Sequence, residues 1–194
     1  MQWTIPNILT FLRIVLIPVL VVVFYLPMPW SYQASALIFG LAAITDWLDG
    51  YLARRLQQTS LFGAFLDPVA DKLMVAVALV LLVQDNPSEL FAVPAAVIIG
   101  REIVISALRE WMAEIGARTR VAVSIVGKVK TTLQMVAILL LLYRVPVGAF
   151  PTHAVGVVLL YIAAILTLWS MFVYLKAAWP ILSGKEGHSP HDDA

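Results

Sequence analysis

The sequence contains no cysteine, and its 194 residues include few charged ones. Without cysteine the chain forms no disulfide, holds no metal through thiolates and has no cysteine nucleophile. Charged residues make up 13% of the chain, about half the ~25% typical of soluble domains. The 13 basic and 12 acidic side chains nearly cancel. Net charge therefore gives no reason to expect a polyanionic partner, and we predict no binding of nucleic acid.

Apolar residues make up 61% of the chain and give it a mean hydropathy of +0.91. A helix needs about 20 apolar residues to cross about 30 Å of hydrocarbon. We therefore predict an all-α, polytopic integral membrane protein with six transmembrane helices and a short amphipathic N-terminal segment around Trp3 and Pro6. The six expected spans are residues 9–25, 32–56, 61–83, 90–115, 121–143 and 153–182.

The chain has no internal repeat, so we predict one membrane domain, residues 1–183, and a polar, disordered tail, residues 184–194. Basic residues concentrate on the cytoplasmic side of membrane proteins. Arg54 and Arg118 are among the basic residues at the span ends expected on one side of the membrane. Arg144 is the single basic residue at the span ends expected on the other side. Six spans then place both termini in the cytoplasm.

Four carboxylates interrupt the apolar sequence between residues 46 and 71. Asp46 and Asp49 are three residues apart near the end of the second expected helix. Asp67 and Asp71 are four residues apart near the start of the third. Each pair projects from one face of its helix, and the short connection makes the two helices antiparallel neighbours. We therefore expect the four side chains to meet just inside the cytoplasmic boundary.

Four carboxylates gathered in an apolar chain repel one another and lose hydration, so they need protons or cations. Arg54, Arg55 and Lys72 are too few to neutralise them, and we expect Arg55 and Lys72 to point away. Hard divalent ions such as Mg²⁺ accept oxygen ligands. Two such ions about 3.5–4 Å apart can hold a phosphate group during its displacement.

The spacing Asp-x2-Asp-Gly-x2-Ala-Arg-x8-Gly-x3-Asp-x3-Asp, which begins at Asp46, resembles the signature of the CDP-alcohol phosphatidyltransferases at every fixed position. In that family a CDP-lipid donates its phosphatidyl group to an alcohol, and CMP leaves. The resemblance implies two Mg²⁺ or Mn²⁺ ions on Asp46, Asp49, Asp67 and Asp71, with Asp71 also the general base. It further implies a CDP-lipid pocket lined by Asp46, Gly50, Ala53, Arg54 and Gly63.

Residues 5–13, 101–114 and 127–132 resemble the bacterial members of the family that use glycerol 3-phosphate. This wider resemblance implies CDP-diacylglycerol as donor and the 1-hydroxyl of glycerol 3-phosphate as acceptor, with phosphatidylglycerol phosphate as product. It also implies a homodimer among the lipids of the bacterial inner membrane, with the active site facing the cytoplasm.

The acceptor's phosphate requires a second anion site. Basic residues deep in membrane helices need a partner or a watery cavity, and we predict that Arg109, Lys128 and Lys130 bind this phosphate. The structural alternative is ion pairing with nearby glutamates such as Glu102. That alternative is preferred for Arg101, although substrate binding remains open. Asn7, Thr10 and Arg13, spaced i, i+3, i+6, are expected at the edge of the donor pocket.

Two other functions stay open from the sequence. One is the same reaction with another acceptor, such as inositol phosphate, phosphatidylglycerol or serine. The other is a divalent-cation transporter whose ion path uses the aspartates. Transport requires polar groups that continue toward the opposite membrane face, and the second and third expected helices contain few.

Overall fold

The computed structural model has six helices and no extended strand in the part of the chain that it describes, which confirms the all-α part of the predicted fold class. It describes residues 5–56, 61–115 and 125–182, without the side chains of residues 5–6, 47, 49–56, 61–62, 64, 125–128 and 180–182. Each helix lies within a few residues of a predicted span. The helices are α1 (Ile5–Phe24), α2 (Ser31–Leu56), α3 (Leu61–Asp85), α4 (Glu89–Glu114), α5 (Ile125–Tyr143) and α6 (Thr152–Leu182).

Proline and left-handed backbone conformations end the helices. α1 stops at Phe24, three residues before Pro27, and α3 stops at Asp85, two residues before Pro87, because proline has no N–H to continue a helix. Arg144, directly after α5, has a φ of 60°. The first residues differ from the expectation: α1 already begins at Ile5, so residues 5–8 continue the first helix instead of forming a separate segment.

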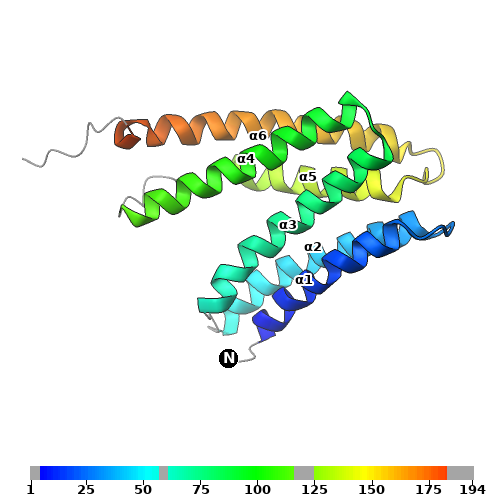
Figure 1. The fold of residues 1–194 in the computed structure, drawn as a ribbon, viewed down its shortest axis with the longest axis horizontal. Coiled ribbons are helices and arrows are strands. Elements are labelled where there is room, and N and C mark those ends of the chain that lie inside the picture. Colours follow the sequence, from blue (N-terminus) through cyan, green and yellow to red (C-terminus); the bar gives the residue numbers. More distant parts are fainter. Residues whose placement is uncertain (1–4, 57–60, 116–124, 183–194) are drawn as a thin grey trace, which may run out of the picture.

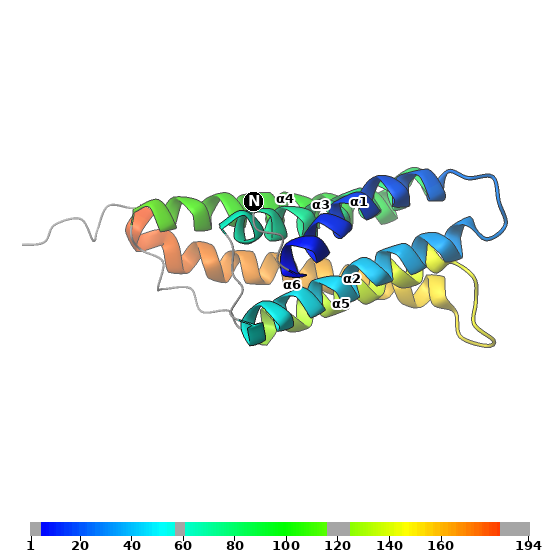
Figure 2. The same ribbon diagram turned by 90° about the horizontal axis from the view of Figure 1, so that it is seen from below.

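The helices alternate in direction along one long axis (Figure 1), and α1 contacts both α2 and α3. α1 packs extensively against both, whereas α2 and α3 touch each other little. On the other side of the bundle, α6 packs against α5 and α4, and α2 runs beside α5 (Figure 2). The two aspartate-bearing helices are therefore joined mainly through α1, which the sequence did not predict.

Apolar side chains form one core along the bundle axis. The close approach of α5 and α6 depends on Gly156, because a Cβ there would lie 2.8 Å from Cγ of Leu141. Any larger residue would push the two helices apart. Every helix contributes fully buried residues to this core: Leu20, Phe39, Met74, Leu79, Ile98, Ile138, Leu142 and Leu160.

The outer surface is also apolar. Leu37, Ile103 and Phe172 are each more than 60% exposed, as expected for a protein whose surroundings are lipid. Among the described residues, three helical segments are long and apolar enough to cross a membrane: Asn7–Phe24, Glu89–Glu114 and Thr152–Trp179. The acidic and basic residues of α2 and α3 lower the hydropathy of those helices.

Candidate active site

Three of the four motif aspartates meet around one arginine. Nη1 of Arg13 lies 3.2 Å from Oδ1 of Asp46, 2.9 Å from Oδ1 of Asp67 and 3.3 Å from Oδ1 of Asp71. The guanidinium is 1% exposed, whereas the three carboxylates are 38–46% exposed. A buried guanidinium thus contacts three carboxylates that remain partly exposed.

Each helix supplies its part of this cluster by local geometry. Asp67 and Asp71 are four residues apart in α3, so they share a face. Asp46 comes from α2 and Arg13 from α1. Because a charged side chain in an apolar helix is costly without a partner, the three ion pairs fix the depth at which α1 lies between its neighbours. The expectation that the two aspartate pairs converge is confirmed for the three whose side chains are described.

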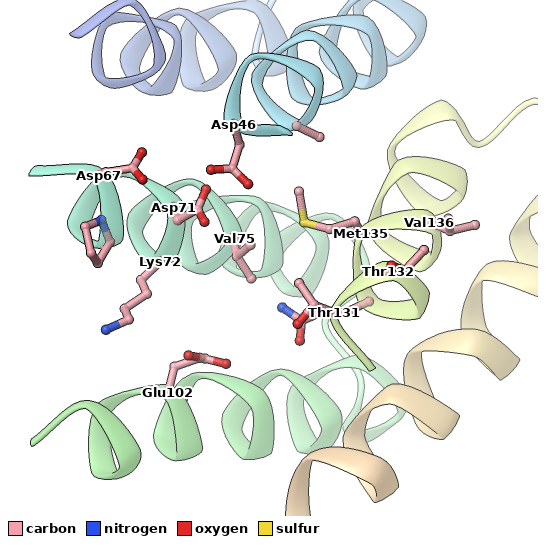
Figure 3. Close-up of a pocket in the computed structure, with 13 residues that line it drawn as sticks. Asp46, Asp67, Asp71, Lys72, Val75, Glu102, Thr131, Thr132, Met135 and Val136 are labelled. Atoms are coloured by element: carbon pink, nitrogen blue, oxygen red, sulfur yellow. The ribbon is translucent and has the colours of Figure 1, made fainter. Parts of the chain in front are cut away.

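The carboxylates open into a cavity of about 530 Å³ between α2, α3, α4 and α5 (Figure 3). Asp46, Asp67 and Asp71 form one wall, and Thr131, Thr132 and Met135 of α5 lie across from Asp46 and Asp71. This volume suits a small polar molecule or the head of a larger one. The described residues that line it are Ala43, Asp46, Asp67, Pro68, Asp71, Lys72, Val75, Glu102, Thr131, Thr132, Gln134, Met135 and Val136.

On the α4 side of the cavity one carboxylate serves two buried cations. Oε1 of Glu102 lies 3.1 Å from Nη1 of Arg101 and 3.5 Å from Nζ of Lys130. Arg101 is 8% and Lys130 4% exposed. The preference for Glu102 as the partner of Arg101 agrees with this geometry. Lys130 reaches the cavity only through Glu102, so its binding of phosphate stays a prediction.

The remaining predicted residues fall into three groups. Arg109 is exposed on α4 and is not among the described residues that line the cavity. Thr10, buried, and Asn7, half-buried, lie on α1 within two turns of Arg13, and Gly63 lies in the first turn of α3, one turn before Asp67. The side chains of five predicted residues lie outside the described part of the chain: Asp49, Gly50, Ala53, Arg54 and Lys128.

From the sequence, Arg13 is expected only at the edge of the donor pocket and Lys72 is expected to point away from the aspartates, so the sequence did not reveal that Lys72 lines the same cavity. The central role of Arg13 could have been predicted, because an arginine in so apolar a helix needs a carboxylate partner. Lys72 lines the cavity, and its Nζ donates to Oγ of Ser106 on α4. The sequence also gave no reason to expect Thr131, Thr132 and Gln134 at the cavity. A polar uncharged residue on a helix does not reveal which other helix it faces.

The donor atoms of the cluster fit a hard divalent ion, whereas their arrangement in this structure is that of an ion-pair cluster. Carboxylate oxygens are the ligands that Mg²⁺ and Mn²⁺ prefer, and three of them already surround a single positive charge. No group of three or more acidic or histidine side chains in the described part of the chain is arranged as a metal site. The point on which these three carboxylates converge is taken by Nη1 of Arg13.

Fold and site together define an all-helical protein with an apolar exterior and a carboxylate-lined cavity near one end of its bundle. The profile of the CDP-alcohol phosphatidyltransferase family matches residues 3–169. The chain belongs to this family. Asp46, Asp67 and Asp71 all lie within the matched region.

The chain is also similar to curated bacterial relatives over most of its length. It is 58% identical over 178 residues to the CDP-diacylglycerol–glycerol-3-phosphate 3-phosphatidyltransferases of Salmonella choleraesuis (strain SC-B67) and Shigella flexneri serotype 5b (strain 8401). It is 57% identical to the enzyme of that name from Escherichia coli (strain K12). Each alignment covers 92% of this chain and 96% of the relative.

Proposed function

We propose that this protein is a CDP-diacylglycerol–glycerol-3-phosphate 3-phosphatidyltransferase. The observation that supports this most directly is the convergence of Asp46, Asp67 and Asp71 at a cavity, in a chain 58% identical to bacterial enzymes of that name. The reaction transfers the phosphatidyl group of CDP-diacylglycerol to glycerol 3-phosphate and releases CMP.

The proposed chemistry is a single in-line displacement. The 1-hydroxyl of glycerol 3-phosphate attacks the lipid-side phosphorus of the diphosphate, and the bond from that phosphorus to the CMP oxygen breaks. The hydroxyl proton passes to Asp71, whose carboxylate faces the cavity and acts as general base. No residue is acylated or phosphorylated on this route, so one transition state suffices.

The negative charge of the diphosphate determines which other groups the site needs. When bound, divalent ions would offset charge on the diphosphate and on departing CMP. Asp46, Asp49, Asp67 and Asp71 would hold two of them, either Mg²⁺ or Mn²⁺. Gly50, Ala53, Arg54 and Gly63 would line the cytidine diphosphate pocket, with Asn7, Thr10 and Arg13 at its edge.

The acceptor would enter from the α4–α5 side. Its phosphate would bind Lys130 and Lys128, with Arg109 at the outer edge and Arg101 nearby. Lys130 is already held next to the cavity by Glu102, and a phosphate dianion can compete with one carboxylate for its ammonium group.

The membrane arrangement belongs to the same proposal. All six helices would span the bacterial inner membrane, with the active site and both termini in the cytoplasm and the acyl chains of the donor among membrane lipids. Residues 1–183 would form one domain and residues 184–194 a polar tail, and two chains would associate as a homodimer.

The test uses purified full-length protein, CDP-diacylglycerol and one acceptor at a time. Glycerol 3-phosphate should release CMP, whereas inositol phosphate, phosphatidylglycerol and serine should not. If another alcohol releases CMP and glycerol 3-phosphate does not, the acceptor assignment is wrong. If no alcohol does and liposomes containing the protein take up Mn²⁺ without CDP-lipid, the transporter alternative replaces it.

A further inference from the structure

One buried amide oxygen beside the cavity has no hydrogen-bond partner among the described residues. Gln134 of α5 lines the cavity and is 4% exposed. Its Oε1 accepts no hydrogen bond from the described part of the chain. A buried carbonyl oxygen without a donor costs about 1–3 kcal/mol, so such an oxygen at a ligand cavity indicates a ligand that brings a donor.

The chemistry of Oε1 limits what that ligand group is. An amide oxygen only accepts hydrogen bonds, as do the oxygens of a phosphate dianion. Gln134 therefore cannot use this atom to bind phosphate or a carboxylate. A hydroxyl or amino group is required.

The position of Gln134 on α5 indicates which hydroxyl or amino group its Oε1 would bind. Gln134 lies four residues after Lys130, on the same helix face and about 6 Å further along the axis. Both side chains are buried, and Lys130 is held beside the cavity by Glu102. A ligand whose phosphate binds at Lys130 would place groups two or three bonds away near Gln134.

We propose that Oε1 of Gln134 accepts a hydrogen bond from the 2-hydroxyl of the glycerol 3-phosphate acceptor, and so selects polyol phosphates with a hydroxyl next to the attacking one. This inference rests on the proposed function. The 2-hydroxyl does not react, so its hydrogen bond orients the acceptor and leaves the 1-hydroxyl free for Asp71.

The test compares two acceptors on the wild-type protein and two variants. The analogue 3-hydroxypropyl phosphate keeps the phosphate and the attacking hydroxyl of glycerol 3-phosphate but lacks the 2-hydroxyl. Wild-type protein should prefer glycerol 3-phosphate by about tenfold in kcat/KM, the worth of one hydrogen bond. Gln134→Met, which has similar volume and no carbonyl, should reduce that preference to near one by losing activity toward glycerol 3-phosphate only.

Thr167→Val is the matched control. Thr167 is fully buried on α6, its Oγ1 also has no hydrogen-bond partner among the described residues, and it does not line the cavity. Its variant should keep the wild-type preference.

The outcomes separate this inference from the proposed function. If wild-type protein uses both acceptors equally well, the inference is wrong without recourse to any variant. An unchanged preference in Gln134→Met, with CMP still released, also overturns it, since Oε1 would then be satisfied by water alone. If glycerol 3-phosphate releases no CMP in any protein, the function itself is wrong.

Discussion

Each end of the bundle contains an arginine held by carboxylate, and the two ends differ in charge balance. At the end opposite the motif, Nη1 of Arg144 lies 2.8 Å from Oδ2 of Asp85, and its guanidinium lies 4.8 Å above the ring of Tyr32. The Tyr32 hydroxyl donates to Oδ1 of Asp85, and Asn86 donates to its Oδ2. One carboxylate there meets one guanidinium, and both its oxygens are satisfied.

At the motif end three carboxylates share the single guanidinium of Arg13. The cavities at the two ends are similar, about 530 Å³ at the motif end and about 450 Å³ at the other. Cavity size therefore does not distinguish them. The excess of carboxylates over guanidinium groups in these two clusters of described residues does, because such an excess needs protons or cations to relieve it. We therefore expect the balanced end to stabilise the bundle and the motif end to bind ligands.

The largest expected effect is that of metal removal. Chelation by EDTA should reduce CMP release to background, because the surplus carboxylates and the diphosphate would repel each other without divalent ions. Mg²⁺ or Mn²⁺ added in excess should restore activity, measured as CMP released per minute. Full activity in EDTA would show that Arg13 alone balances the motif end, and would remove the distinction between the two ends.

The next largest effect is expected when one carboxylate is neutralised at each end and the kcat values of the two variants are compared. Asp71→Asn should lower kcat by about 10²–10⁴, the usual worth of a general base, while binding of CDP-diacylglycerol is largely retained. Asp85→Asn, the matched change at the balanced end, should leave kcat near wild type and lower the thermal midpoint instead. Near-normal turnover of Asp71→Asn would exclude this residue as the base.

A smaller effect is expected from the buried lysine near the cavity. Lys130→Ala should raise the KM for glycerol 3-phosphate by roughly tenfold, as for loss of one charge-assisted hydrogen bond, with less change in the KM for CDP-diacylglycerol. Arg144→Ala removes a cation at the balanced end and should change neither KM. If Lys130→Ala leaves the acceptor KM unchanged, its role is limited to the ion pair with Glu102.

The motif was predictable because its spacing is local. The intervals between Asp67 and Asp71, and between Asp46 and Asp49, place each pair on one helix face whatever surrounds it. Arg13 shows the limit of this reasoning. It lies 33 residues before Asp46, and nothing local to α1 states that it reaches between α2 and α3. Its central position follows from α1 packing between those helices, which separates them.

The acceptor side shows the same limit. The sequence offered Arg101, Arg109, Lys128 and Lys130 as basic candidates, and could not rank them by what they contact. The structure joins Arg101 and Lys130 through Glu102, leaves Arg109 exposed, and places Gln134 at the cavity. Side chains on different helices meet only when particular faces pack together, and this depends on the whole core.

The sequence by itself determined that there are six helices, to within a few residues of their ends, and where the aspartate motif lies along them. Apolar run length, prolines and helical spacing are properties of neighbouring residues, so they can be read along the chain. Tertiary structure alone decided that three aspartates gather on Arg13, that one glutamate holds two cations, and that an unpartnered amide faces the same cavity. Those relations arise from the packing of helices distant in sequence, where burial requires each charge to find a partner and leaves the surplus at the site that binds.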